Sequence, residues 1–561
     1  MIETDRIQEM AEHEEHLVET REFRIFGPPG TGKTTNLSRQ IGRAAARYGA
    51  HQVLVTSFSR AAAAELTARD LPIPGQMVGT LHSHCWHALG GPKIAEANVN
   101  EWNRDHPDLA ITPVKRQGAK LEGEENVEDD PENTKQGDAA LQRLSRYRGA
   151  RKERKLWPRT VLEFDALWSE YKRENGLLDF TDLIEVALRE VALAPHAPSV
   201  IFADEAQDLN ALQLALIRKW GQRAEYFIVA GDDDQTIYSF TGATPDAFLD
   251  PEVPADHRII LKQSYRVPRA VHAFAERLIH TVSRRQVKEY VPRDEEGAVA
   301  RSLDTCRRPE HIVADIARSL ESGKDVMLLA ACAYMLQPVI RALRSEGVPF
   351  HNPYRRSNGS WNPLHIGKPG SAASRIVALV GGHPASGQGY RPWTMDDVVQ
   401  WAEWLAAKSV LRHSVKSKLK TMGTLEEATI EKLNAVFESG ALDALADAWD
   451  GGCAALVEWW QKRLPFEVGQ RVQFPVDIAK KRGPQALARK PQVIVGTIHS
   501  VKGGQADTVY VFPDLSQAGD LEYRSTGLPK DSVIRLFYVA ATRARERLVI
   551  CESVGDARIW L

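Results

Sequence analysis

Three absences in the sequence narrow the class of protein before any motif is considered. No uninterrupted apolar run reaches 18 residues, so no membrane-spanning helix is expected. Residues 1–20 are acidic and polar, which argues against a secretory signal. The cysteines form no C-x-x-C pair, which argues against a zinc site or a disulfide framework and favours a cytoplasmic location; they are Cys85, Cys306, Cys332, Cys453 and Cys551.

Neither positive nor negative side chains are in large excess in the sequence. The 72 Lys and Arg residues nearly balance the 74 Asp and Glu residues, which gives a formal net charge of −2. Any surface that binds a polyanion must therefore be local. Carboxylates are dense over residues 122–132, and Arg and Lys are dense over residues 143–155. This segregation fits either an acidic loop beside a solvated helix face or a surface that contacts DNA.

The most specific motif follows a short apolar run at residues 23–26. Its pattern, G-x-x-x-x-G-K-[ST], forms a phosphate-binding loop when it joins a strand to a helix. The glycines let backbone N–H groups point at phosphate oxygens, and the helix N-terminus adds partial positive charge. We therefore predict that a nucleoside triphosphate binds here, with Lys33 at the β- and γ-phosphates and Thr34 ligating Mg²⁺. The loop comprises Gly27, Pro28, Pro29, Gly30, Thr31, Gly32, Lys33, Thr34 and Thr35.

Other apolar runs end in polar residues, as parallel strands do when their carboxyl ends carry the chemistry. Residues 200–203 lead into Asp204 and Glu205, and residues 226–230 lead toward Gln235. A second set of such runs occupies residues 259–261, 326–331, 493–497, 509–512 and 548–551. The length of 561 residues fits three or four ordinary domain units, so we predict an α/β protein with two parallel sheets, each carrying an insertion.

These polar residues supply the groups that phosphoryl transfer needs. We predict that Asp204 holds Mg²⁺ through water and that Glu205 orients or deprotonates the attacking water. Gln235 is expected near the γ-phosphate. Charge that develops on the phosphoryl group requires cations, for which Arg266 and Arg543 are candidates. Because both arginines belong to the second set of strands, ATP would lie between the two sheets, and its hydrolysis would open and close that cleft.

Two residue clusters have a structural interpretation beside a functional one. His82, His84 and Cys85 could ligate a metal, but two of them are adjacent and no fourth ligand lies at suitable spacing. Tryptophans at helical spacing are more often core than platforms for stacked bases. Those between residues 356 and 490 are Trp361, Trp393, Trp401, Trp404, Trp449, Trp459 and Trp460.

Eight segments occur in the order of the motifs of superfamily 1 helicases. They run from residue 27 to residue 546, nearly the whole chain, and the sequence most resembles the UvrD/Rep/PcrA helicases. The stretch DFTDL at residues 179–183 also resembles that family. The eight segments are GPPGTGKTT, TSFSRAAAAEL, GTLHSHC, DEAQD, GDDDQTIYSFTGA, LKQSYR, GTIHSVKGGQAD and YVAATRARE.

The resemblance implies an α/β fold of two RecA-like P-loop domains with parallel sheets, each with a mainly helical insertion. The expected parts are domain 1A at residues 1–86 and 176–255, insertion 1B at 87–175, domain 2A at 256–355 and 491–561, and insertion 2B at 356–490.

The resemblance also implies an activity. The family members are ATP hydrolases and DNA helicases that use Mg²⁺, move on single-stranded DNA, usually 3′ to 5′, and separate strands at duplex junctions in repair, recombination or replication. By motif match, Lys33, Thr34, Asp204, Glu205, Gln235, Arg266 and Arg543 keep the roles given above, Tyr265 stacks on the adenine, and Gln505 belongs to the nucleotide site. DNA contacts are implied for Ser57, Phe58, His82, Phe240, Thr497 and His499.

Several positions depart from the family pattern. The usual L-N-x-x-Q segment that contacts adenine is not matched before the P-loop, where Gln8 is the only candidate. Phe240 replaces a tryptophan, Thr241 stands where arginine is common, and Gln505 stands where glutamate is common.

Two functions remain open on the sequence. One is an active DNA helicase or translocase, and the other is a DNA-stimulated ATPase that acts as a switch or recruitment module with little unwinding. Displacement of a duplexed strand separates them. An enzyme of the RecD type with opposite polarity is disfavoured by the GDDDQTIYSF and QSYR segments.

Overall fold

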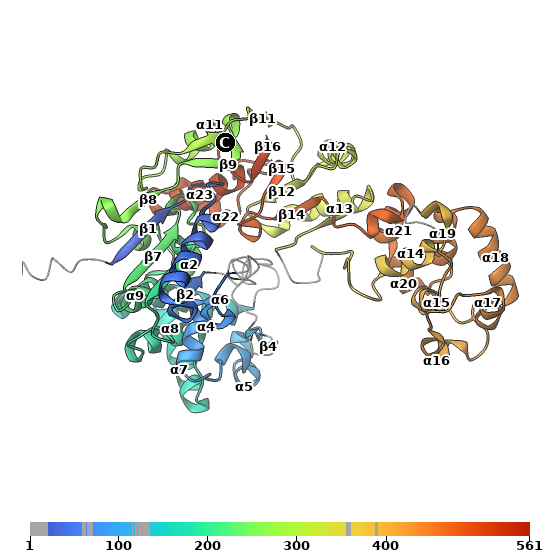
Figure 1. Ribbon diagram of the computed structural model, residues 1–561, viewed down its shortest axis with the longest axis horizontal. Coiled ribbons are helices and arrows are strands. Elements are labelled where there is room, and N and C mark those ends of the chain that lie inside the picture. The colour runs from blue at the N-terminus through green and yellow to red at the C-terminus, as the bar shows by residue number, and fades with distance from the viewer. Residues whose placement is uncertain are drawn as a thin grey trace, which may run out of the picture. The chain divides into compact units, whose positions relative to one another are not determined.

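The computed structural model describes residues 21–58, 71–114, 135–354, 361–386 and 391–561, with Ala63 and the short pieces 116–117 and 120–121. Two compact units emerge from it (Figure 1). The first comprises the chain up to Val299, together with Leu515–Glu546 and Leu561, and the second comprises Ala300–Asp514 and Arg547–Trp560. Gln8, the acidic stretch 122–132 and most of the segment TSFSRAAAAEL lie outside the described residues.

The first unit is built on a six-stranded sheet with the order β3-β2-β6-β7-β1-β8. All neighbouring strands in it are parallel, so their carboxyl ends meet at one edge, where Ser57 pairs with Asp204 and Phe26 with Gly231. The predicted runs 23–26, 200–203 and 226–230 form three of these strands, and the central strands are apolar because they are buried on both faces. The run 259–261 was expected in the second sheet, but it contributes to β8, which pairs with β1 in this one. They are β1 Glu22–Phe26, β2 Val53–Ser57, β3 Val78–Thr80, β6 Val200–Asp204, β7 Tyr226–Gly231 and β8 Arg258–Ile260.

Two helices of the first unit begin at residues that form capping boxes. The Asp179 carboxylate accepts from the Asp182 N–H at the start of α8, and Asn210 caps α9 in the same way through Gln213. A further parallel pair, β9 Gln263–Pro268 with β10 Val291–Arg293, follows β8. The helices are α2 Lys33–Tyr48, α4 Leu81–Ala88, α8 Phe180–Glu190, α9 Ala211–Gly221, α10 Pro245–Leu249, α11 Arg269–Ile279, α22 Gln517–Arg524 and α23 Leu528–Ala541.

A helical insertion with its own core lies between β3 and β6. Its helices are α5 Asn100–Asp105, α6 Gln136–Gly149 and α7 Arg159–Asn175. Trp102, Phe164 and Trp168 lie at the centre of that core. Arg148, from the basic run, is buried there and pairs with three carboxylates: Asp179 at 3.0 Å, Asp182 at 2.5 Å and Glu185 at 2.7 Å. Arg148 therefore belongs neither to a solvated face nor to a DNA-binding surface.

The second unit contains most of a six-stranded sheet with the order β11-β16-β15-β12-β14-β13. Residues 298–299 and 544–546 of this sheet are grouped with the first unit. The pairs β12–β14, β12–β15 and β13–β14 are parallel, so the α/β fold class with two sheets is confirmed. The strands are β11 Ala298–Arg301, β12 Val326–Ala330, β13 Phe350–His351, β14 Val493–Thr497, β15 Ala506–Val511 and β16 Ala544–Ile550. The helices α12 Glu310–Ser319 and α13 Gln337–Ser345 pack on this sheet.

Between β13 and β14 the chain forms a group of helices, as Figure 1 shows. The predicted core role of its tryptophans is confirmed: Trp361, Trp393, Trp401, Trp459 and Trp460 are buried, and Trp404 and Trp449 pack against them. No helix in the described part of the chain is long and apolar enough to span a membrane. The helices are α14 Ala372–Gly381, α15 Met395–Ala402, α16 Val415–Lys418, α17 Ile430–Val436, α18 Ser439–Asp450, α19 Cys453–Lys462, α20 Phe466–Arg471 and α21 Gln473–Arg482.

Candidate functional site

The phosphate-binding loop connects β1 to α2 at the carboxyl edge of the first sheet. Gly30 and Gly32 have φ values of 76° and 75°, which favour glycine. A Cβ at Gly30 would lie 2.5 Å from the Arg266 Cβ, and one at Gly27 would lie 2.8 Å from the Lys33 Cβ. The loop therefore keeps its path only with glycine at these positions.

Strand β9 lies directly against this loop. The Ser264 hydroxyl donates to the Pro29 carbonyl at 2.9 Å, and the Tyr265 N–H donates to the Gly30 carbonyl at 2.8 Å. The Tyr265 side chain is 74% exposed, and its ring comes within 4.0 Å of the position that a Cβ on Gly32 would take. The structure thus brings Tyr265 and Arg266 beside the loop, with the tyrosine ring available to a planar base. Arg266 was expected to come from the second sheet, but its strand β9 belongs to the first unit.

Lys33 pairs with both carboxylates at the end of β6. Its ammonium contacts Glu205 and lies 3.4 Å from Asp204 Oδ1. Burial opposes the charge on Lys33, but Glu205 and Asp204 outweigh it and raise the pKa of Lys33 well above its usual value. Burial also raises the pKa of Asp204, against the opposing effect of the Lys33 ammonium. The predicted lysine and the two predicted carboxylates therefore form one cluster.

Gln207, for which the sequence predicted no role, holds Glu205 from the other side. Its Nε2 donates to Glu205 Oε2 at 2.6 Å, and its Oε1 accepts from the Asp232 N–H at 3.1 Å. Glu205 itself has a φ of 53°, an uncommon backbone conformation for a residue with a side chain. Only the position of Gln207 within DEAQD could have indicated this role. Both oxygens of the Glu205 carboxylate are consequently held in place.

Gln235 and Arg543 meet in the first unit. Gln235 Nε2 donates to Asp232 Oδ2 at 2.7 Å, and Arg543 Nη2 donates to Gln235 Oε1 at 3.1 Å. Arg543 Nε also donates to the Val539 carbonyl at 2.9 Å, which caps its own helix α23. The expectation was that Arg543 reaches the site only when two domains close. In the structure this contact is already present, because Leu515–Glu546 is grouped in the same compact unit as the P-loop, and its dependence on domain closure stays a prediction.

The donor set at the loop fits a hard divalent cation. Thr34 stands in the first turn of α2, and Asp204 ends β6, so a hydroxyl and a carboxylate are available. Mg²⁺ prefers such oxygen ligands and takes the remainder from water and phosphate. Among the described residues no group of three or more His, Cys, Asp or Glu could hold a metal alone. Any Mg²⁺ here would therefore depend on the bound nucleotide for part of its coordination.

The alternative metal cluster around His84 is a part of the core. His84 is buried, its Nε2 lies 3.1 Å from the Val55 carbonyl, and burial lowers its pKa to about 4. Cys85 is buried as well, and burial raises the pKa of its thiol. A neutral histidine bound to a backbone carbonyl and a protonated thiol are structural groups, so this cluster is not a metal site.

Aromatic side chains gather where DNA contacts were expected in the first unit. The Phe58 ring lies 4.9 Å from the Tyr238 ring, which lies 5.7 Å from the Phe240 ring. Tyr238 was not named from the sequence, although it stands inside GDDDQTIYSFTGA. His82 contacts Phe180 edge to face at 5.9 Å, whereas Ser57 is only 2% exposed. The aromatic rings are therefore placed where bases could stack on them, whereas Ser57 has little exposed surface for a DNA contact.

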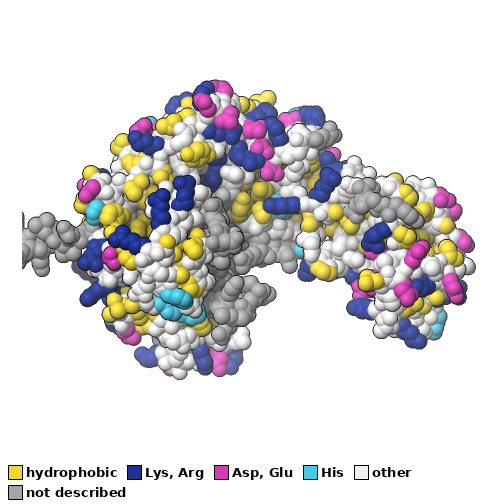
Figure 2. Space-filling model, viewed as in Figure 1, with side chains coloured by type: hydrophobic (Ala, Val, Ile, Leu, Met, Phe, Trp, Pro, Cys, Tyr) yellow, Lys and Arg dark blue, Asp and Glu magenta, His cyan; other side chains and the backbone are white. Residues whose placement is uncertain are grey.

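The remaining predicted residues belong to the second unit. Thr497 ends β14, is buried, and accepts from the Ser500 N–H at 3.2 Å through its hydroxyl. His499 is partly exposed and Gln505 is exposed just before β15. Figure 2 shows Lys and Arg side chains distributed over the visible face of both units with Asp and Glu among them, in line with the near-zero net charge.

Comparisons with known proteins agree with the motif order. A family model for the UvrD/REP helicase N-terminal domain matches residues 9–255, and one for the UvrD-like helicase C-terminal domain matches residues 492–551. The ATP-dependent DNA helicase UvrD2 of Mycobacterium tuberculosis is 25% identical over 94% of this chain and 76% of its own length. A probable DNA helicase II homolog of Mycoplasma pneumoniae is 21% identical over 94% of this chain and 81% of its own.

Proposed function

This chain belongs to the UvrD/Rep-like superfamily 1 DNA helicases, and on that premise we propose that it is an ATP-dependent DNA helicase. It hydrolyses ATP, moves on single-stranded DNA in the 3′ to 5′ direction and separates strands at duplex junctions, in repair, recombination or replication. The observation that carries the proposal is the convergence of Lys33, Glu205, Gln235 and Arg543 at one edge of the first sheet.

Each of these side chains has a distinct part in the proposed hydrolysis. Lys33 and the loop N–H groups bind the phosphates, which compete with Glu205 for the same ammonium. Glu205, oriented by Gln207, accepts the proton of the attacking water. Arg543, held against Gln235, neutralises charge that develops on the phosphoryl group. Mg²⁺, held by Thr34 and Asp204, would supply positive charge to the β- and γ-phosphates.

The structure supports the domain arrangement that we propose from the sequence. The separate core of the insertion before β6 supports an insertion 1B at residues 87–175, and the helical group between β13 and β14 supports an insertion 2B at residues 356–490. The two sheets support domains 1A and 2A. The compact grouping of Leu515–Glu546 with the P-loop supports a nucleotide site in which Arg543 is already near Gln235.

The aromatic group of Phe58, Tyr238 and Phe240 supports single-stranded DNA as the track. Base stacking on aromatic rings tolerates any sequence, because every base has a π-face, and contributes about 1–3 kcal/mol per base. Thr241, which replaces an arginine common in the family, donates through its hydroxyl to the Tyr238 carbonyl at 2.8 Å. Thr241 thereby stabilises the turn that contains Tyr238, and it does not supply the positive charge that an arginine would add to the DNA-binding surface.

We expect a duplex with a 3′ single-stranded tail to be unwound in an ATP-dependent reaction, and one with a 5′ tail or blunt ends to be unwound poorly. Gel or fluorescence assays on the three substrates measure this directly, with Lys33→Ala as the inactive control. Stimulated ATP hydrolysis without strand displacement on any substrate would support the switch or recruitment module instead. Preference for the 5′ tail would contradict the proposed direction.

Stimulation of the ATPase by single-stranded DNA should weaken as salt rises. Each phosphate contact releases a counterion on binding, so with about five contacts the apparent affinity should fall about 100-fold between about 50 and 200 mM salt. The maximal rate at saturating DNA should change much less. Titrations of an oligonucleotide into the ATPase assay at several salt concentrations give both quantities. Stimulation that is independent of salt would indicate that a protein, rather than DNA, is the activator.

A further inference from the structure

Residues 281–290, between α11 and β10, form a strap that contacts three parts of the proposed ATP site. The Tyr290 hydroxyl donates to the Pro29 carbonyl of the P-loop at 2.8 Å. The Gln286 N–H donates to Asp233 Oδ2 at 2.8 Å. On the side of α23, the Ser283 N–H donates to Asp531 Oδ2 at 3.1 Å, and Arg535 donates to the Arg284 carbonyl at 2.6 Å. The strap therefore joins the P-loop, the segment after β7 and the helix that leads to Arg543.

A buried lysine of the strap, Lys288, faces three consecutive carboxylates. Its Nζ lies 2.7 Å from Asp232 Oδ1, 2.6 Å from Asp233 Oδ1 and 2.9 Å from Asp234 Oδ2. Its side chain is 1% exposed, and all three aspartates are buried. Burying the Lys288 ammonium costs desolvation free energy, and the attraction of the three carboxylates offsets this cost. Burial acts to lower the pKa of Lys288, but the three carboxylates raise it well above the usual value.

The contacts of Lys288 continue as a chain of hydrogen bonds to the proposed arginine finger. Lys288 donates to one oxygen of Asp232, and the other oxygen accepts from Gln235 Nε2 at 2.7 Å. The remaining polar atom of that carboxamide, Gln235 Oε1, accepts from Arg543 Nη2 at 3.1 Å. The order Lys288, Asp232, Gln235, Arg543 alternates donor and acceptor at every step.

The charge on Asp232 sets which way the Gln235 carboxamide faces. An ionised carboxylate can only accept, so it binds the NH₂ end of the amide and leaves the oxygen toward Arg543. With the amide reversed, two donors would meet at Arg543 and the guanidinium would be pushed from its position. Lys288 matters because it compensates the buried negative charge that this orientation requires.

We propose that Lys288 is a positioning residue of the ATP site, which acts through Asp232 to orient Gln235 and Arg543. This inference rests on the proposed ATPase function. Lys288 touches neither the phosphates nor the attacking water; it orders the groups that do. Its contribution is expected in the chemical step rather than in nucleotide binding, because pre-oriented donors lower the barrier without adding contacts to the ground state.

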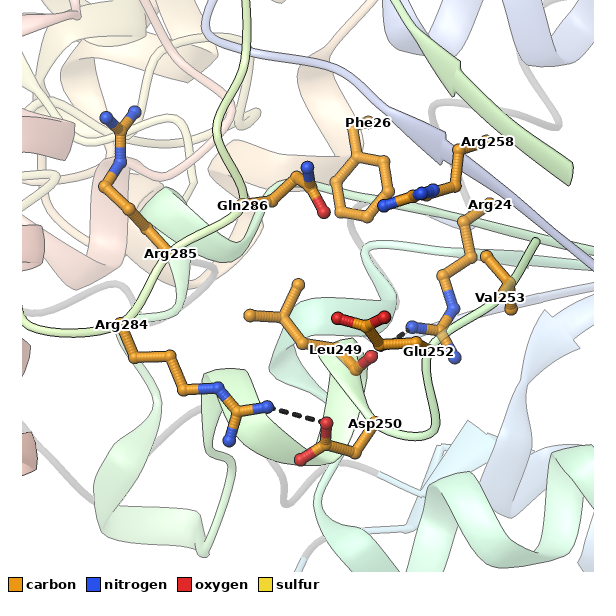
Figure 3. A pocket seen from close by; sticks show the side chains of 10 residues that line it. All are labelled: Arg24, Phe26, Leu249, Asp250, Glu252, Val253, Arg258, Arg284, Arg285 and Gln286. Carbon is orange, nitrogen blue, oxygen red and sulfur yellow. Dashed lines mark hydrogen bonds and ion pairs between the residues drawn. The ribbon is translucent and has the colours of Figure 1, made fainter. Parts of the chain in front are cut away.

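The strap also offers a matched control, Arg284. Arg284, Arg285 and Gln286 line a cavity of about 120 Å³. Figure 3 shows Arg284 at this cavity, bound to Asp250. Arg284 pairs with Asp246 and Asp250 at 2.6 Å each, but its side chain is 50% exposed and takes no part in the chain to Arg543. Substitution of Arg284 removes from the same strap a cation that is paired with two carboxylates, and it leaves the surroundings of Gln235 unchanged.

The test compares Asp232→Asn, Lys288→Met, Lys288→Arg and Arg284→Met with the full-length wild type. For each protein, kcat of the DNA-stimulated ATPase and affinity for a fluorescent ATP analogue are measured. Asp232→Asn and Lys288→Met should lower kcat about 10- to 100-fold with affinity nearly unchanged. Lys288→Arg, which keeps the charge, should recover part of kcat, and Arg284→Met should match the wild type. The double variant Asp232→Asn, Lys288→Met should be no worse than the poorer single one.

Three results would overturn the inference. A kcat equal to that of the wild type in Asp232→Asn would show that the orientation of Gln235 does not depend on this carboxylate. The Asp232→Asn measurement alone tests the inference if Lys288→Met fails to fold. Equal losses of kcat and affinity in all strap variants, Arg284→Met included, would indicate a merely structural strap. Absence of DNA-stimulated hydrolysis in the wild type would overturn the proposed function and this inference together. Failure of this inference alone would instead leave the wild type active, with the variants unaffected or all equally impaired.

Discussion

Replacing Arg543 with alanine should reduce DNA-stimulated ATP hydrolysis by about 10³-fold or more and leave much of the nucleotide affinity intact. The physical reason is that Arg543 Nη2 is bound to Gln235, the residue expected beside the γ-phosphate, rather than to the P-loop. Its charge would therefore act on the transferring phosphoryl group and little on binding of the ground state. Strand displacement should be lost together with hydrolysis.

The second contact of Arg543 makes the lysine variant informative. Because Arg543 Nε caps the Val539 carbonyl while Nη2 reaches Gln235, one planar fork makes both contacts. An ammonium cannot make them together, so Arg543→Lys should rescue hydrolysis poorly. Arg524→Ala, which removes an exposed arginine paired with Asp520 on α22, is a suitable control and should behave as the wild type.

Measurement of ATPase activity, analogue binding and thermal unfolding on one preparation of each variant decides the matter. If Arg543→Ala hydrolyses ATP within a few-fold of the wild type, Arg543 only caps α23 and is not an arginine finger. If its unfolding temperature falls sharply while Arg524→Ala is unchanged, loss of the cap contributes as well.

Replacing Glu205 with glutamine should lower hydrolysis about 10²- to 10⁴-fold, the range of general-base catalysis, without weakening nucleotide binding. The amide has nearly the same shape and can still accept from Gln207 through its oxygen, but it cannot take a proton from water. Lys33 would also lose one of its two carboxylate partners and so be more available to the phosphates. The nucleotide affinity of Glu205→Gln is compared directly with that of Lys33→Ala, which should lose both binding and hydrolysis.

An exposed glutamate gives the control for the loss of charge. Glu225 accepts from the Tyr48 hydroxyl at 2.9 Å, away from the loop, and Glu225→Gln should leave kcat unchanged. Single-turnover hydrolysis and analogue binding, measured with and without DNA, report the two effects separately. Normal turnover by Glu205→Gln would remove Glu205 from the role of base.

The sequence by itself determined most of the strands and the core of the nucleotide site, although it assigned the run 259–261 to the wrong sheet. Buried parallel strands are short apolar runs, and the loop between β1 and α2 requires glycine where φ is positive, so both features are readable locally. The carboxylates after β6 follow from the same rule, because polar residues at a strand end collect at one edge of a parallel sheet. Lys33, Asp204 and Glu205 were therefore predictable as one cluster.

Only the tertiary structure decided which charged and polar residues serve as structure and which face the site. Arg148 in a basic run and Lys288 in an ordinary loop became buried partners of carboxylates, and Gln207 came to bridge Glu205 and Asp232. The grouping of Arg543 with Gln235 joins residues more than 300 positions apart. Composition and local periodicity do not encode such pairs. Their partners are chosen by packing, because a charge removed from water must find a counter-charge wherever the fold brings one.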